Sequence, residues 1–368
     1  MLESEVSMFN SIDAIGKESM DSIADDGFFT YGYFKTLERM KTIKSHPSYL
    51  AITQNGKTIA VATYFINPRN QVLSPNGRVP FAQKIALAVN RFGFNSNNIE
   101  ACHSPDSFHS KILIEKGCSE KRVLFLVSKK IDDICKRERI LFSSFPYVSE
   151  SDRILMKNLG NFGYVKYPSA TTYYLDIEWS SFDEYVDSLG SYKIKKNVRR
   201  EIKKCEESGV SIVEESEFGD ISTTLSDLHS NLFSKYNKGI ENPRDASFFG
   251  LLSEYAKDKT RVLVAKRRGK IIGFSLFFQH KGIFDVSVCG FDYNSQTKTD
   301  FTYFNLIYYA PIRLAIQEGM TRIHFSINSG LLKLRRGCKS EKMYSFVKCH
   351  NRLLGPLFNL YMKRIRAR

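Results

Sequence analysis

Two stretches of sequence decide the fold: LAITQNGKTIAVATYFI at residues 50–66 and LVAKRRGKIIGFSLFFQ at residues 263–279. Each has an apolar run, a polar turn ending in Gly-Lys, and a second run rich in β-branched and aromatic residues. This pattern is typical of a β-hairpin whose turn glycine takes a positive φ. At a constant offset of 213 residues the stretches share Leu50/Leu263, Gly56/Gly269, Lys57/Lys270, Ile59/Ile272 and Phe65/Phe278.

A predicted helix precedes each of these hairpins. Residues 34–40 (FKTLERM) and 249–256 (FGLLSEYA) both carry apolar residues at positions i and i+3, as one face of a helix would. Because helix and hairpin recur in the same order, the sequence predicts an internal duplication and therefore two domains of similar fold.

Helices and strands alternate on both sides of the hairpins. In the first half the patterns predict helices at 18–40, 81–92 and 149–160, and strands at 121–129 (running into a helix at 130–138), 139–145 and 171–177. In the second half they predict helices at 181–189, 192–208, 220–236 and 302–319, and strands at 284–291 and 322–327. Such alternation predicts an α/β (α+β) fold in two domains, residues 1–170 and 171–350, each a mixed sheet flanked by helices, followed by a basic helix or tail at 351–368.

The composition is that of a core-forming globular protein with localised charge. Of the 368 residues, 42% are hydrophobic and 25% are charged, which argues against disorder. The net charge of +15 is concentrated in residues 193–204 (KIKKNVRREIKK, net +6) and residues 331–368 (net +10), so the remainder is close to neutral. This distribution excludes a uniformly basic coat of the histone kind.

Several other classes of protein are disfavoured. The apolar runs are shorter than the roughly 20 residues of a membrane-spanning helix, and the N-terminal segment is acidic where a secretory signal would be basic. The seven cysteines are scattered without a C-x-x-C pair, which is typical of reduced thiols, and the neighbouring Cys and His residues at 102–109 and 349–350 do not have zinc-ligand spacing. We therefore expect a cytoplasmic protein without a metal site.

The segment at residues 169–212 reads SATTYYLDIEWSSFDEYVDSLGSYKIKKNVRREIKKCEESGVSI. Its Thr-rich strand ending in Leu-Asp, its acidic helix and its basic K/R-x-x-x-R-R helix resemble the Fem-like (FemAB-like) acyl- and aminoacyl-transferases, which are tandem GNAT-fold proteins. The opening at 11–38 and the loop SGLLKLRRG at 329–337 are also similar to that family, so the resemblance covers most of residues 10–348. One departure is the segment at 290–305 (GFDYNSQTKTDFTYFN), which lacks the glycines that wrap the CoA pyrophosphate in simple GNAT enzymes.

The resemblance implies an enzyme, an acyltransferase that moves an acyl or aminoacyl group from acyl-CoA or aminoacyl-tRNA to an amine acceptor. It is consistent with peptidoglycan biosynthesis, with a cell-envelope precursor as acceptor, and also with a small peptide or metabolite as acceptor. The carrier would be a co-substrate, so no tightly bound cofactor is expected, and no DNA partner is expected. Direct attack by the amine is favoured because no Ser/His/Asp or Cys/His motif is visible. The alternative is a non-catalytic protein that binds RNA or a membrane surface on a GNAT-like scaffold.

Acyl transfer to an amine requires a deprotonated acceptor, a stabilised oxyanion and a protonated leaving group. In the second domain, Asp292 is the preferred general base or amine anchor, with turn formation as the alternative role. Tyr303 is the candidate proton donor, and His324 is a candidate acid or base; core packing is the alternative for both.

A second group of candidates would hold the phosphate of the donor. Lys333, Arg335 and Arg336 crowd one glycine-bounded turn, and cations so close repel one another unless they share an anion. The turn is therefore predicted to bind the donor, and a solvated loop is the rival interpretation.

Residues with a predicted role in substrate binding complete the set. On the basic helix, Arg199 and Arg200 belong to cationic stripes that could follow a phosphate backbone or simply face solvent. Asn305 and Asn328 are grouped with them as substrate-binding candidates.

The C-terminal segment at 352–368 (RLLGPLFNLYMKRIRAR) combines leucines and aromatic residues with arginines. As an amphipathic helix it could make peripheral contact with an anionic membrane. The interpretation we favour is a terminal helix that docks on its own domain.

Overall fold

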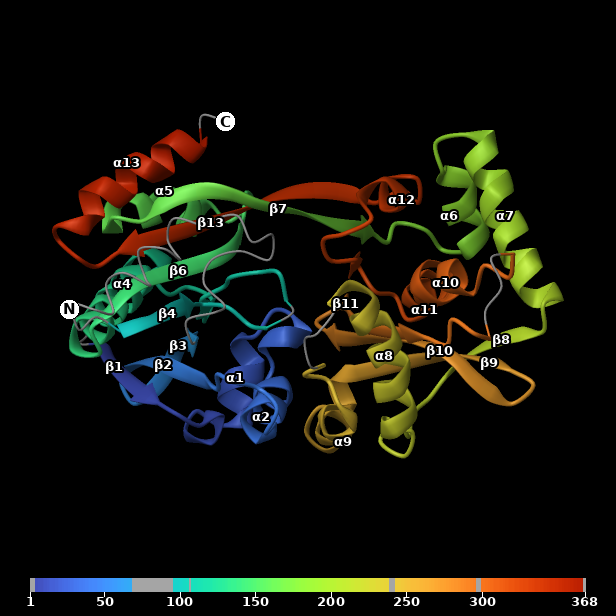
Figure 1. Ribbon diagram of the computed structural model, residues 1–368, viewed down its shortest axis with the longest axis horizontal. Helices are drawn as coiled ribbons and strands as arrows, with labels where there is room; N and C mark the ends of the chain where they lie inside the picture. The colour runs from blue at the N-terminus through green and yellow to red at the C-terminus, as the bar shows by residue number, and fades with distance from the viewer. Residues whose placement is uncertain (1–3, 68–94, 106, 238–241, 296–298, 367–368) are drawn as a thin grey trace. The chain divides into compact units, whose positions relative to one another are not determined.

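The computed structural model describes residues 4–67, 95–105, 107–237, 242–295 and 299–366 (Figure 1). Contacts divide the chain into two compact units that are not consecutive halves. Unit 1 contains Met1–Ala24, Ile43–Thr171 and Glu341–Arg368, and unit 2 contains Asp25–Thr42 and Thr172–Ser340. Each unit therefore includes a segment from the part of the sequence that mainly forms the other.

Unit 1 is a mixed sheet with helices packed on it. Its strands follow the order β1-β2-β3-β4-β6-β13-β7, with β5 beside β3, and the pair β4–β6 is parallel. Its helices are α1 (Lys17–Ile23), α4 (Glu120–Arg137), α5 (Arg153–Asn158) and α13 (Leu354–Arg366). Its strands are β1 (Ser4–Phe9), β2 (Pro47–Gln54), β3 (Lys57–Asn67), β4 (Asn95–Ala101), β5 (Leu113–Ile114), β6 (Ile140–Ser149), β13 (Lys339–Cys349) and the first half of β7 (Val165–Asp176).

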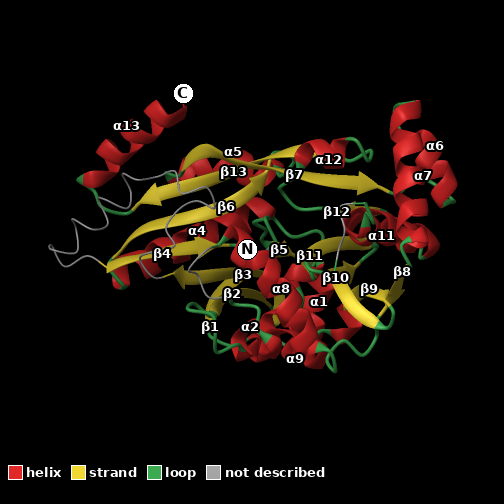
Figure 2. Cartoon of the chain, turned by 45° about the vertical axis from the view of Figure 1, so that its right-hand side comes forward, coloured by secondary structure: helices red, strands yellow, loops and turns green. Residues whose placement is uncertain are grey.

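Unit 2 repeats this plan. Its strands follow the order β7-β12-β11-β10-β9-β8, and the pair β11–β12 is parallel. Its strands are the second half of β7, β8 (Val210–Glu214), β9 (Thr260–Arg267), β10 (Lys270–His280), β11 (Ile283–Phe291) and β12 (Arg322–His324). Its helices are α2 (Tyr31–Arg39), α6 (Phe182–Ser188), α7 (Tyr192–Glu207), α8 (Ser222–Tyr236), α9 (Ala246–Tyr255), α10 (Thr302–Phe304), α11 (Ala310–Gln317) and α12 (Gly330–Leu334), with a π-helical turn at Asn305–Tyr309 (Figure 2).

The two predicted hairpins are confirmed, and their registers correspond. Gly56 and Gly269 both sit in the turn with left-handed φ values of 76° and 77°. Phe65 of β3 lies opposite Glu100 of β4, and the corresponding Phe278 of β10 lies opposite Asp285 of β11. The predicted fold class, with a mixed sheet flanked by helices in each domain, is therefore confirmed.

The helix predicted before the first hairpin forms, but it packs within unit 2. Helix α2 lies against α9, and its Thr36 hydroxyl donates to the backbone carbonyl of Leu251 at 3.4 Å. Before it, a short 3-10 turn (η2, Gly27–Phe29) packs on β10, where the ring of Phe28 contacts that of Phe278 at 4.9 Å. The helix of the first repeat thus completes the fold of the second.

Several predicted elements differ from the structure. Residues 121–129 are part of the continuous helix α4, because Val123, Val127 and Ile131 form one buried face at helical spacing. The single helix expected at 18–40 is two helices, α1 and α2, separated by the turn η2. The strand expected at 322–327 ends at His324, and the turn expected at 329–337 begins with α12. The helix expected at 81–92 lies outside the described residues.

No helix in the described part of the chain is long and apolar enough to cross a membrane.

Helix α2 approaches α9 so closely that Gly32 has no room for a side chain. A Cβ at Gly32 would collide with the backbone of Tyr255 and Ala256. Gly32→Ala should therefore lower the free energy of unfolding by about 1–3 kcal/mol, measured by denaturant titration. Gly250→Ala within α9 is the matched control, because nothing lies within 4 Å of that position, and it should stabilise by up to about 1 kcal/mol. Equal effects of the two substitutions would contradict this packing.

Candidate functional site

The place where the parallel strands β11 and β12 part is called here the opening of unit 2. Strands β11 and β12 pair only at Ile283–Arg322, Phe284–Ile323 and Asp285–His324. Strand β12 also pairs with β7, and beyond His324 the chain keeps its contact with β7 alone: the Phe325 N–H donates to the Tyr173 carbonyl at 2.8 Å, and the Tyr173 N–H donates to the Ser326 carbonyl at 3.1 Å. Strand β11 continues to Phe291 without pairing with β12. Helix α8 (Ser222–Tyr236) occupies part of this edge of β11, because the His229 ring donates to the Cys289 carbonyl at 2.9 Å and the Asn231 amide donates to the Phe291 carbonyl at 3.2 Å.

A β-bulge lies on β11 beside this opening. Leu276 of β10 lies opposite Val288, whereas the next residue, Phe277, lies opposite Val286, so Ser287 is the extra residue. Bulges turn backbone and side chains toward a site, and they are frequent next to active sites.

Aromatic residues of the helix that follows β11 pack beside the end of that strand. The ring of Tyr303 lies 5.6 Å from that of Phe291 and 6.1 Å from that of Tyr308, which in turn lies 5.2 Å from Phe325. Burial raises the pKa of Tyr303, and interaction with the side chains of Tyr308 and Ser329 lowers it in part. The Tyr303 phenol therefore carries its proton at neutral pH and can donate it.

Two titratable side chains occupy the last paired position. Asp285 is buried, with 2% exposed, and its carboxylate accepts a hydrogen bond from the Gly27 N–H at 3.3 Å. His324, across the strand pair, is half-buried and lies 6.0 Å from the ring of Tyr174. His324 was predicted from the sequence as a candidate acid or base, whereas Asp285 was not predicted. The available signal was a single carboxylate in the apolar strand FDVSVCGF.

The turn at 333–336 separates the three cations that the sequence grouped. Lys333 is buried, and its ammonium group donates to three backbone carbonyls, those of Phe325, Ser326 (3.0 Å) and Ile327 (3.0 Å). Burial lowers its pKa to about 8. Three acceptors match the three protons of an ammonium group, so Lys333 fixes the chain that leaves β12.

The side chain of Arg336 also makes its contacts within the fold. Its guanidinium donates to the Glu201 carboxylate of α7 at 2.9 Å and to the Leu332 carbonyl at 3.1 Å. It lies 4.2 Å from the ring of Phe304, and the Tyr309 hydroxyl donates to the same Glu201 carboxylate. Arg335, by contrast, is exposed. Of the three predicted phosphate ligands, only Arg335 lies open to solvent.

Asp292 lies in a turn at the end of β11. Its carboxylate accepts from the backbone N–H groups of Asn294 and Ser295, from the Ser295 hydroxyl and from Lys270 at 2.8 Å. Its pKa is lowered to about 2, mainly by the hydrogen bond from Lys270. These contacts match the turn-forming role given as the alternative, and such a low pKa makes a weak base.

The predicted substrate-binding residues do not converge on one point. Arg199 pairs with Asp187 at 2.6 Å, joining α7 to the neighbouring α6 (Figures 1 and 2). Asn305 is buried, and its amide donates to the Glu201 carbonyl at 3.0 Å. Asn328 is exposed in the chain that leaves β12, beside the opening. Arg200 is exposed and lies 5.6 Å from the ring of Phe301.

Two adjoining cavities lie where β11 leads to α10. One, of about 510 Å³, is lined by Arg200, Lys204 and Asp300, and the other, of about 650 Å³, by Arg267, Arg268 and Lys270. Both include Glu207 and Ser208 in their walls. Among the described residues, Arg200 and Arg268 make no ion pair, so each can bind an added anion.

Unit 1 contains a corresponding strand opening. The parallel pair β4–β6 ends at Glu100–Ser144, so Glu100 occupies the position that Asp285 has in unit 2. Burial raises the pKa of Glu100 to about 7. Cys102, Phe108 and Tyr147 nearby in the chain all have left-handed φ values, between 49° and 57°, which are rare for such residues and are concentrated at functional sites.

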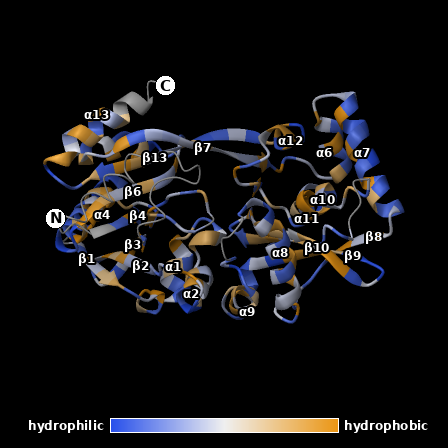
Figure 3. Cartoon of the chain, viewed as in Figure 1, coloured by the Kyte–Doolittle hydropathy of each residue, from blue (hydrophilic) through white to orange (hydrophobic). Residues whose placement is uncertain are grey.

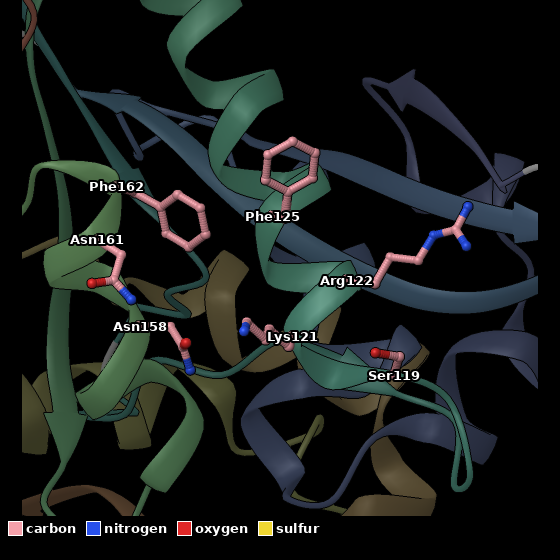
Figure 4. Close-up of a pocket in the computed structure, with 7 residues that line it drawn as sticks. All are labelled: Ser119, Lys121, Arg122, Phe125, Asn158, Asn161 and Phe162. Atoms are coloured by element: carbon pink, nitrogen blue, oxygen red, sulfur yellow. The ribbon is translucent and has the colours of Figure 1, made fainter.

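A further pocket of unit 1, of about 430 Å³, lies at the first turn of α4 (Figure 4). Phe125 and Phe162 face each other across it with ring centres 6.2 Å apart, and Asn158 and Asn161 lie along one side. The sequence analysis singled out none of these residues. No group of three or more potential metal ligands occurs in the parts of the chain that the structure covers.

Comparison with solved structures places the fold in a known class. Over 94% of this chain and 98% of the other, the structure is similar to FemX (TM-score 0.60, 12% identity). It is similar to the C-terminal DUF2156 domain of a putative lysylphosphatidylglycerol synthetase from Agrobacterium fabrum (TM-score 0.58, 12% identity, 96% and 97% covered). It is also similar to a tandem GNAT protein from the clavulanic acid biosynthesis pathway (TM-score 0.50, 9% identity, 95% and 99% covered). The fold is therefore GNAT-like.

The family follows from the sequence comparison. Residues 11–368 match the FemAB-like family, described as peptidoglycan biosynthesis/recognition, and the chain belongs to this family. No curated protein sequence matches the chain significantly. Family and fold together support a transferase.

The buried pair of Arg336 and Glu201 should be essential for stability. Removing one partner leaves the other charge buried without compensation, so Arg336→Met should lower the free energy of unfolding by about 3–5 kcal/mol. The neighbouring substitution Arg335→Met is the control, and it should change stability by less than about 0.5 kcal/mol because Arg335 is exposed. Denaturant unfolding of both variants measures the two changes in stability. If Arg336 served only to bind phosphate, the two variants would be equally stable.

The turn contacts of Asp292 should produce a pH-dependent contribution to stability. Its pKa is lowered from 3.8 to about 2, so the contribution is present above pH 4 and is lost as the pH falls toward 2. The free energy of unfolding of the wild type should exceed that of Asp292→Asn by up to about 2 kcal/mol at pH 6. This difference should shrink steadily between pH 4 and 2. A difference independent of pH would contradict the assigned contacts.

Proposed function

We propose that the protein is an acyltransferase that moves an acyl or aminoacyl group from acyl-CoA or aminoacyl-tRNA to an amine acceptor. The observation that carries the proposal is the parting of β11 and β12 after Asp285 and His324. A bulge at Ser287 and the buried carboxylate of Asp285 lie at this parting, and the phenol of Tyr303 packs beside Phe291 at the end of the same strand.

The extended part of the donor would lie between the parted strands. Backbone N–H groups at the Ser287 bulge would align it and would stabilise the oxyanion that forms at the acyl carbon. In the reaction the amine nitrogen bonds to the acyl carbon, and the carbon–sulfur or carbon–oxygen bond to the carrier breaks.

The reaction needs one group that takes a proton from the acceptor amine and another that gives a proton to the leaving group. We assign the first role to Asp285, which would hold the ammonium group of the acceptor and take its proton, with His324 beside it. Tyr303 would protonate the leaving thiolate or alkoxide of the carrier, since burial keeps its phenol protonated. Asp285 thus replaces Asp292 as the proposed base.

Phosphates of the donor would bind near the start of α10. Arg200 and Arg268, which make no ion pair with the described residues, offer guanidinium groups there in the two adjoining cavities. They supply the anion-binding function that the sequence assigned to Lys333 and Arg336, which are buried in internal contacts.

The acceptor we propose is an amine of a cell-envelope precursor. The support is the family description, peptidoglycan biosynthesis/recognition, together with the similarity to FemX. The protein would act in the cytoplasm, where such precursors and charged tRNA are made.

Single substitutions at the opening test the proposed chemistry. The purified protein is incubated with labelled aminoacyl-tRNA or labelled acyl-CoA and a peptidoglycan precursor peptide that carries a free amine. Asp285→Asn and Tyr303→Phe should each lower kcat by about 10²- to 10⁴-fold, because each removes one proton-transfer group. Asp292→Asn is the matched control, and it should retain most activity because that carboxylate serves a turn.

Two outcomes would contradict the proposal. Equal losses for Asp292→Asn and Asp285→Asn would show that the carboxylate at the opening has no special role. Tight binding of RNA without transfer from either donor would instead indicate a non-catalytic RNA-binding protein on this scaffold.

A further inference from the structure

Helix α13 carries two apolar faces, only one of which packs on the protein. Phe358 and Met362 are buried, with 0% and 1% exposed, and they join a small core with Leu141, Phe142 and Val347. The ring of Phe358 lies 5.1 Å from that of Phe142. This inner face accounts for the docking of the helix on unit 1, as the favoured prediction had it.

The second apolar face points to solvent. Leu353, which directly precedes the helix, is 84% exposed, Leu357 is 61% exposed, and Leu360 is 54% exposed. Their spacing of four and three residues aligns them in one row along the helix. A helix that only docks on a domain turns polar residues outward, so docking does not explain this row. Figure 3 shows hydrophobic residues recurring along α13.

The charge around this row is of one sign. Residues 352–368 contain Arg352 and, in the last six positions, Lys363, Arg364, Arg366 and Arg368, and they contain no acidic residue. Exposed leucines in a segment whose sequence is basic and has no acidic residue fit an anionic lipid surface, which takes up apolar side chains at the acyl boundary and attracts cations.

From these observations we propose that α13 binds peripherally to anionic membranes through the lipid-facing row Leu353, Leu357 and Leu360. The helix lies in the plane of the interface and stays attached to unit 1 through Phe358 and Met362. The proposal is independent of the acyl-transfer chemistry, because none of these residues belongs to the opening in unit 2.

Vesicle flotation of the full chain tests the membrane contact. The wild type should float with vesicles of phosphatidylcholine containing about a third phosphatidylglycerol, but not with pure phosphatidylcholine, and 0.5 M salt should weaken binding. The triple variant Leu353→Ser/Leu357→Ser/Leu360→Ser should bind the anionic vesicles at least about tenfold more weakly. Its unfolding midpoint should equal that of the wild type, because the row lies outside the core.

A matched control removes exposed leucines elsewhere. Leu331 and Leu334 of α12 are 64% and 48% exposed, and Leu331→Ser/Leu334→Ser should leave vesicle binding unchanged. The proposal is overturned if the wild type binds no vesicles, or if the triple variant binds as well as the wild type. It is also overturned if sedimentation shows that the leucine row joins two copies of the chain in place of lipid.

Discussion

A parallel pairing of only three residues in each strand, between β11 and β12, determines the shape of unit 2. After Asp285 and His324 the chain of β12 turns to β7, while β11 runs on through a bulge to Phe291. The proposed site depends on this divergence, because a longer ladder would extend the pairing of β11 with β12 past Ser287. The three carbonyl contacts of Lys333 help to hold the diverging chain in place.

The buried charged side chains of unit 2 make their contacts within the fold. Glu201 joins the basic helix α7 to Arg336 and Tyr309, so the same helix that exposes cations to solvent is anchored by an ion pair inside. An uncompensated charge at such a depth is costly, so these groups cannot readily turn outward to bind phosphate. The exposed cations Arg200 and Arg268 can respond to an anion without such a loss.

Much of the fold could be predicted from the sequence, because many of its elements depend on residues that are close together in the chain. The hairpins at 50–66 and 263–279, the Ser181 cap of α6 and the glycine after α7 each act within a few residues. Helix α2 could be predicted, but its packing against α9 could not, because this depends on a contact between residues more than 200 positions apart. The prediction of a strand at 121–129 was wrong. Its run of Val, Leu and Phe fits the two-residue repeat of a strand as well as the 3.6-residue repeat of a helix, and only the burial of Val123, Val127 and Ile131 identifies a helix.

The candidate site could be predicted only in part. His324 lies at the last paired position of β12, Tyr303 packs beside Phe291 and Arg200 is exposed, and their roles stay predictions. Lys333 and Arg336 were grouped by their proximity in sequence, whereas their roles depend on carbonyls and on a carboxylate supplied by other segments. Asp285 was missed because its importance comes from its place at the end of a strand pairing, which no local pattern records.

Hydrogen exchange on the intact protein tests the central claim most directly, because it reports where the donor lies. With aminoacyl-tRNA or acyl-CoA added, amide exchange should slow in residues 286–291 of β11 and 325–328 after β12, and the strand pair β4–β6 of unit 1 serves as the internal reference. Protection confined to the basic helix α7, with no change along the parted strands, would contradict the claim that the donor binds between them.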